Sequence, residues 1–207
     1  GLFAVIETPA LLRDIGVTHL AYTAGFEPSM GGLVGQSLGT IAYSFATGSI
    51  HAGDSNFGLG DVGGLVGYST VSIEHSYAAV SLKTGAVEFV GGLAGENSGT
   101  ISDSYATGSA RARAGSYVAG FVSVNHSSAT ITRCHATGSA VEVDGKEGLA
   151  GGFASVNFGT ISQSFAVGSS AASRGGLSGG FAGANEGSIS DSYSRGNSSV
   201  VSGDKKY

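Results

Sequence analysis

Residues 91–108 read Gly-Gly-Leu-Ala-Gly-Glu-Asn-Ser-Gly-Thr-Ile-Ser-Asp-Ser-Tyr-Ala-Thr-Gly, and most of the chain is a variation on this stretch. The first block, Gly-Gly-Leu-Ala-Gly, has six copies in register, with leucine or phenylalanine at positions 33, 65, 93, 121, 153 and 181. The isoleucine of the second block recurs at positions 41, 73, 101, 131, 161 and 189. The chain is therefore an internal repeat array, and this repetition governs the choice of fold.

The spacing of the copies gives the repeat length. Successive leucine or phenylalanine positions lie 32, 28, 28, 32 and 28 residues apart, so the basic unit has 28 residues. Such a unit is too short to close a core alone, shows no sustained 3.6-residue apolar period, and falls short of the roughly 40 residues of a propeller blade. The repeats therefore predict an all-β fold, a parallel β-solenoid (β-helix) of about seven coils, with ~28 residues and about three short strands per coil.

The array also sets the expected organisation of the chain. Residues 31–200 hold the six clear repeats of the solenoid. Residues 1–30 hold a poorer copy, which we interpret as a degenerate first coil or an N-terminal cap, because terminal repeats usually depart from the consensus. Residues 201–207 are interpreted as a polar C-terminal tail.

Composition excludes several other classes of protein. Glycine supplies 37 of the 207 residues, about 18% against a usual ~7%, but only 2 residues are proline, which excludes collagen. The single cysteine excludes a disulfide scaffold, and the absence of a long apolar run predicts no membrane insertion. A net charge of −5 argues against nucleic acid as a partner.

Equivalent positions of neighbouring repeats are expected to stack into columns along the solenoid. Two apolar columns form the candidate core, at Leu33, Leu65, Leu93, Phe121, Phe153 and Phe181 and at Ile41, Ile73, Ile101, Ile131, Ile161 and Ile189. A third column holds Asn97, Asn125, Asn157 and Asn185. We expect its amides to hydrogen-bond from coil to coil, and asparagine also tolerates the left-handed conformation of a sharp corner.

Two further columns accompany these. One is aromatic, at Phe45, Tyr77, Tyr105, His135, Phe165 and Tyr193. Stacked rings stabilise an interior or an exterior face equally well, so the sequence leaves the direction of this column open. The other column is serine except at Cys134, which predicts a small buried position, because a free cysteine behaves as a small hydrophobe.

The paired blocks Gly-Gly-Leu-Val-Gly and Gly-Thr-Ile-Ser-Asp-Ser-Tyr-Ala-Thr-Gly resemble the GLUG repeat, over about residues 31–198. GLUG repeats are known from bacterial surface and secreted proteins, including filamentous-haemagglutinin-like adhesins and the non-catalytic regions of IgA-cleaving peptidases. The resemblance therefore implies an elongated extracellular or cell-surface module, and it supplies no catalytic residue.

Residues that could carry chemistry are scattered along the chain. The five histidines form no His-Glu-x-x-His motif. Asp103 and Asp191 share a column but lie three coils apart, ~14 Å, whereas a glycosidase pair needs roughly 5–10 Å. Asp54, Asn56 and Asp61 are calcium candidates in the longest insertion, but the twelve-residue calcium-binding motif is not met. We therefore expect a plain surface loop there, no metal, no cofactor and no enzymatic activity.

The segment between the second block and the next first block carries much of the charge. Arg111 and Arg113 lie in it, with Lys83 at a comparable place one coil earlier, and later copies of the segment hold Glu142, Asp144, Lys146 and Glu147. Two interpretations remain open: a solvated edge that preserves solubility, or a side that faces a ligand.

Three functions fit these features. The first is a non-enzymatic structural and adhesive rod that displays loops to a host or neighbouring-cell surface protein or glycan. The second is an extracellular filament, in which copies of the chain stack end to end through their open coils. The third is a carbohydrate-binding or carbohydrate-acting solenoid, which an exposed aromatic column with adjacent carboxylates would favour.

Overall fold

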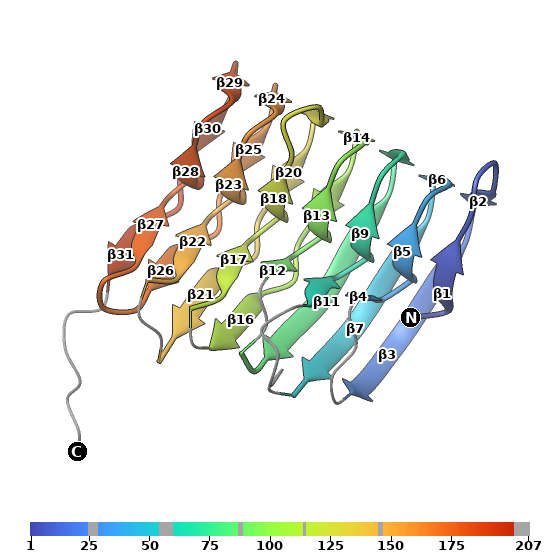
Figure 1. Cartoon of the computed structure of the whole chain (residues 1–207), viewed down its shortest axis with the longest axis horizontal. Coiled ribbons are helices and arrows are strands. Elements are labelled where there is room, and N and C mark those ends of the chain that lie inside the picture. The colour runs from blue at the N-terminus through green and yellow to red at the C-terminus, as the bar shows by residue number, and fades with distance from the viewer. Residues whose placement is uncertain (25–28, 54–59, 87–88, 114, 145–146, 201–207) are drawn as a thin grey trace.

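A computed structural model of the chain describes residues 1–24, 29–53, 60–86, 89–113, 115–144 and 147–200. Within these ranges every regular element is a β-strand, and all strands pair in parallel in four sheets that run the length of the molecule (Figure 1). The described residues include no helix that could cross a membrane. The all-β parallel solenoid predicted from the repeats is confirmed.

We designate the four sheets A to D. Sheet A holds β1 (Phe3–Ile6), β5 (Val34–Ser37), β9 (Val66–Ser69), β13 (Ala94–Asn97), β18 (Val122–Asn125), β23 (Ala154–Asn157) and β28 (Ala182–Asn185). Sheet B holds β2 (Leu11–Arg13), β6 (Thr40–Ala42), β10 (Ser72–Glu74), β14 (Thr100–Ser102), β19 (Thr130–Thr132), β24 (Thr160–Ser162) and β29 (Ser188–Ser190).

Sheet C is the widest, because most coils contribute two strands to it. It holds β3 (Gly16–Ala24), β7 (Phe45–Ala52), β11 (Tyr77–Thr84), β15 (Tyr105–Ala106), β16 (Ala110–Arg113), β20 (His135–Ala136), β21 (Ala140–Val143), β25 (Phe165–Ala166), β26 (Ser170–Ala172), β30 (Tyr193–Ser194) and β31 (Ser198–Val200). Sheet D holds β4 (Ser29–Gly31), β8 (Asp61–Gly63), β12 (Phe89–Gly91), β17 (Tyr117–Ala119), β22 (Leu149–Gly151) and β27 (Leu177–Gly179).

Two details of the prediction need correction. Each full coil crosses four sheets instead of about three strands, because the chain bends at the two residues between a sheet D strand and the next sheet A strand, such as Gly92 and Leu93 between β12 and β13. The chain makes about six turns instead of about seven, since the seven strands of sheet A are separated by six turns. At the expected spacing of about 4.8 Å per coil, the stack is roughly 30 Å long.

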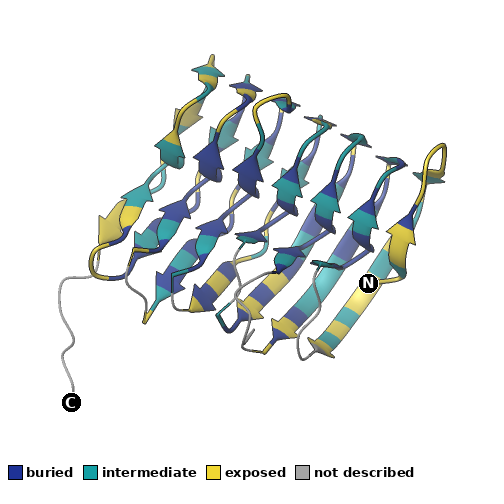
Figure 2. Ribbon diagram, viewed as in Figure 1, coloured by how far each residue is buried: buried dark blue, intermediate teal, exposed yellow. Residues whose placement is uncertain are grey.

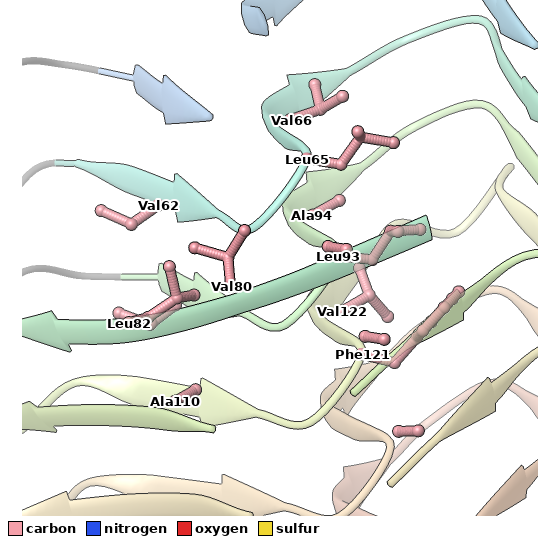
Figure 3. Close-up of a cluster of buried hydrophobic side chains, with 14 of the residues drawn as sticks. Val62, Leu65, Val66, Val80, Leu82, Leu93, Ala94, Ala110, Phe121 and Val122 are labelled. Atoms are coloured by element: carbon pink, nitrogen blue, oxygen red, sulfur yellow. The ribbon is translucent and has the colours of Figure 1, made fainter. Parts of the chain in front are cut away.

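The core is a continuous apolar column inside the four sheets. Leu33, Leu65, Leu93, Phe121 and Phe153 are fully buried, as are the isoleucines from Ile41 to Ile161 in the parallel column. Figure 2 shows the buried positions continuing from coil to coil, and Figure 3 shows Leu65, Leu93 and Phe121 one above another in successive coils. Fully burying each such side chain contributes about 1.5–3 kcal/mol, so the column supplies much of the driving force for folding.

The second glycine of each first block allows the coils to approach closely. This position is glycine in all six repeats, at Gly32, Gly64, Gly92, Gly120, Gly152 and Gly180. The Gly152 N–H donates to the Gly179 carbonyl oxygen at 3.1 Å, and a Cβ on Gly152 would overlap the carbonyl oxygen of Gly180. Any side chain at this position is therefore excluded by the backbone of the next coil, because that backbone cannot move aside independently.

Candidate functional surface

The asparagine column forms a hydrogen-bonded ladder inside the solenoid. The Asn97 Nδ2 donates to Asn125 Oδ1 at 2.9 Å, and Asn125 Nδ2 donates to Asn157 Oδ1 at 2.8 Å. Asn157 in turn donates to Asn185 at 2.7 Å. The first three asparagines are completely buried, so these bonds replace water that the amides lost on folding. These residues lie in sheet A strands, and the structure gives none of them a positive φ.

The left-handed corner lies instead between sheets B and C. Its φ angles run from 47° to 58°, at Asp14, Tyr43, His75, Asp103, Arg133, Gln163 and Asp191. Such a conformation costs an ordinary residue roughly 1–2 kcal/mol, so it needs local compensation. The expectation that the asparagines take the left-handed turn is therefore wrong.

A serine ladder directly after the corner supplies that compensation. The Ser44 N–H donates to Ser76 Oγ at 3.1 Å, and the Ser76 N–H donates to Ser104 Oγ at the same distance. Each hydroxyl also donates to the carbonyl two residues earlier, as Ser104 Oγ does to Ser102 at 2.7 Å. One buried hydroxyl thus closes its own corner and links it to the preceding coil.

Cys134 occupies this ladder with an almost fully buried thiol. Its N–H donates to Ser164 Oγ at 3.1 Å, and its Sγ lies 3.2 Å from the Thr132 carbonyl oxygen. Burial raises the pKa of the Cys134 thiol from 9.0 to about 12, because the thiolate would lose its hydration. The thiol is therefore kept protonated at neutral pH.

This pKa predicts a loss of stability in base. The folded pKa lies above the unfolded one, so the thiol's contribution is complete below about pH 9 and declines as the pH rises toward 12. The decline approaches 1.36 kcal/mol per pH unit. Urea titrations of the wild type and Cys134→Ser between pH 8 and 11 measure it. We expect the wild type to lose stability more steeply, and parallel curves for the two proteins would contradict the assignment.

The aromatic column lies on the outer face of sheet C. Its rings alternate with buried alanines such as Ala78 and Ala106, so the rings point outward and are half-buried, except Tyr193 at 50% exposed. The Tyr77 and Tyr105 rings stack with centroids 4.8 Å apart and planes 2° apart. Stacking continues from Phe45 through to Tyr193 at 4.8–5.2 Å.

This geometry limits what the aromatic column can bind. Each ring covers the faces of its neighbours, so the column presents ring edges to solvent. Phe45 additionally lies over Gly16, and the Arg195 guanidinium lies 5.6 Å from the Tyr193 ring centroid. A sugar that stacks on an aromatic face finds no free face along the middle of the column. The column therefore stabilises the coil stack, by about 0.5–1.5 kcal/mol per pair beyond burial.

The corner beside the aromatic column carries its own side-chain ladder. The Arg13 guanidinium lies 4.5 Å from the Tyr43 ring centroid, and Tyr43 stacks on His75 at 4.8 Å. Arg133 then donates to both oxygens of Asp103, each at 2.7 Å. The hydrogen bond from Arg133 lowers the pKa of the Asp103 carboxyl, which keeps this exposed pair ionised.

Two basic side chains lie on successive coils along the far side of the same face, and the next coil has Val141 at this position. Register pairs Lys83 with His51 on one neighbouring coil and with Arg111 on the other, and all three side chains are exposed. Arg113 lies two residues further on and contacts Asp144 at 3.5 Å. The segment is therefore a solvent-facing strand with two aligned cations, a feature common to both interpretations of it.

Glu142 is a buried structural carboxylate, although the sequence placed it in the solvent-facing charged segment. It points into the solenoid from β21 and is only 1% exposed. Gly115 N–H donates to Oε1 at 3.2 Å, and Ser173 N–H donates to Oε2 at 2.8 Å. The Ser173 hydroxyl donates to the same oxygen, so one carboxylate joins the loops of three coils. Its position in a charged segment gave no sign of burial.

The calcium candidates are only partly within the described ranges. Asp54 and Asn56 lie outside the described residues. Asp61 is in β8, where Oδ2 accepts a hydrogen bond from Ser29 Oγ at 3.0 Å. No group of three or more histidine, cysteine, aspartate or glutamate side chains in the described ranges is arranged to hold a metal ion.

The architecture defines a class of protein: a repeat-type β-solenoid module whose repeated positions are used for coil-to-coil stacking. Comparison with protein families is consistent with this class, because the GLUG motif matches residues 90–111, in the best copy of the repeat. No curated protein and no solved structure matches the chain.

Proposed function

We propose that the chain is a non-enzymatic, adhesive module of an extracellular or cell-surface protein. In this role the solenoid is a stiff rod that presents an attachment surface to a host or neighbouring cell. The observation that carries the proposal is the set of continuous ladders. Asparagine amides, serine hydroxyls and aromatic rings all bond or stack between coils, so the repeated positions serve rigidity.

The surface chemistry supports attachment over catalysis. The outward positions of sheet B are mostly short hydroxyl side chains, such as Thr100, Thr130 and Thr160. These side chains are held at the coil spacing and lose little entropy when a partner binds. A flat, regular surface of this kind suits a large partner that spans several coils.

Adhesion of coated beads tests the proposal. Fluorescent beads carrying the covalently coupled chain are washed under flow over epithelial cells, bacterial cells and a glycan array, next to albumin-coated beads. We expect several-fold greater retention of the solenoid beads on at least one surface. Retention equal to that of albumin on every surface would contradict the adhesive role. Release of new reducing ends from array polysaccharides would contradict a non-enzymatic one.

A further inference from the structure

The outer face of sheet C has an unusual charge balance for an acidic protein. The net charge of the whole chain is −5. Among the described strands of sheet C, the only carboxylate is Glu142, and it is buried. The same strands expose Lys83, Arg111 and Arg113. Asp144, directly after β21, pairs with Arg113 at 3.5 Å, so the positive charge of this face that lacks a carboxylate partner lies at Lys83 and Arg111.

The cations are placed directly opposite one another. Lys83 and Arg111 are register partners on adjacent coils, which brings their backbones to about 4.8 Å. Like charges in this arrangement destabilise a sheet. Within the described residues, neither side chain makes an ion pair that would offset the repulsion. An anionic partner would remove this cost, so the arrangement is better suited to the bound state than to the free one.

A hydroxyl column borders the cations. Ser81 and Ser109 precede Lys83 and Arg111 by two residues, ~6.6–6.8 Å along the strand, and both are exposed. The column continues through Ser49, Ser139 and Ser169 in the neighbouring coils. Cations beside a hydroxyl row match a polymer that carries both negative groups and many hydroxyls.

We propose that this face binds an acidic polysaccharide whose chain runs parallel to the solenoid axis. Its carboxylates contact Lys83 and Arg111 on successive coils, and its hydroxyls form hydrogen bonds with the serines of the hydroxyl column. The covered ring faces of the aromatic column disfavour a single-stranded nucleic acid, which would need exposed rings for base stacking.

This inference rests on the proposed attachment function and names its ligand class. The probe is a fluorescent oligogalacturonate, titrated with the intact chain at low and at physiological salt. We expect binding that weakens as salt rises. The variant Lys83→Gln/Arg111→Gln should bind at least tenfold more weakly. The matched variant Arg13→Gln/Arg133→Gln removes the same two charges from the corner and should bind as the wild type does.

Three results would overturn the inference. The first is no binding of oligogalacturonate by the wild type. The second is an equal loss of affinity in both double variants, which would show that binding depends only on the overall charge of the protein. The third is equal binding of polyglutamate, which has the carboxylates but no sugar hydroxyls. If the coated beads still adhere in any of these cases, the ligand class is wrong while the attachment function stands. If the beads also fail to adhere, both proposals fall.

Discussion

Replacement of Gly152 by alanine is expected to destabilise the solenoid by at least about 3 kcal/mol, the upper part of the range for overpacking. The added Cβ overlaps the Gly180 carbonyl oxygen, and that oxygen belongs to the backbone of the next coil. Relief requires the two coils to separate, which weakens the hydrogen bond from Gly152 N–H to Gly179 and the ladders beside it. For a chain of this size the loss lowers Tm by roughly 6–12 °C.

The repeat provides a matched control at Gly180, the equivalent position in the next coil. A Cβ on Gly180 meets the Gly196 carbonyl oxygen at 2.9 Å and Ser194 Oγ at 3.1 Å, a much milder contact. Thermal unfolding followed by circular dichroism compares the two variants. Gly180→Ala should lower Tm by less than half as much as Gly152→Ala. Equal shifts would show that close coil approach is not the reason for the glycine.

Asn125→Ala is expected to cost about 2–4 kcal/mol. The substitution removes two inter-coil amide bonds, so Asn157 Oδ1 loses its ladder donor and Asn97 Nδ2 keeps only its 3.2 Å bond to the Gly99 carbonyl oxygen. An unsatisfied buried polar group costs about 1–3 kcal/mol, and Asn97 and Asn157 are both fully buried. Because the cavity left by the amide is polar and small, a water can restore only part of this loss.

Asn185→Ala is the control for the ladder. Asn185 makes only one inter-coil amide bond, and its side chain is exposed. Urea denaturation should show a loss of less than about 1 kcal/mol for this variant, in line with a single solvated hydrogen bond. If Asn125→Ala is no more harmful than Asn185→Ala, the ladder contributes little to stability.

The repeat spacing was enough to predict the fold class, because inside-outside alternation and a constant period leave few ways to bury the Leu33 and Ile41 columns. It was not enough to count the strands in a coil. The extra sheet depends on where the chain bends, and the bend at Gly92 and Leu93 lies inside the Gly-Gly-Leu-Ala-Gly block, where the sequence gives no sign of a division between two strands.

The sequence was enough to predict which residues make up the candidate surface, but not whether their side chains point outward or inward. Sequence identified the aromatic column and the cations Lys83 and Arg111, since both are repeated or aligned positions. The outward direction of the rings follows from the adjacent alanines, such as Ala78 and Ala106, which fill the interior. The left-handed corner was missed because Tyr43, His75 and Arg133 share no side-chain chemistry; only their backbone is alike. The signal that could have located this corner is the small residue, serine or cysteine, that follows each of these three positions.

The ladders also give the solenoid axis a direction. Every asparagine amide donates to the coil of higher number, and every backbone N–H that meets a ladder hydroxyl does the same. The individual dipoles therefore add instead of cancelling, and each bond polarises the next one. A coil turned upside down in the stack would therefore not match its neighbours in these ladders. In these ladders, one face of each coil therefore donates hydrogen bonds and the opposite face accepts them.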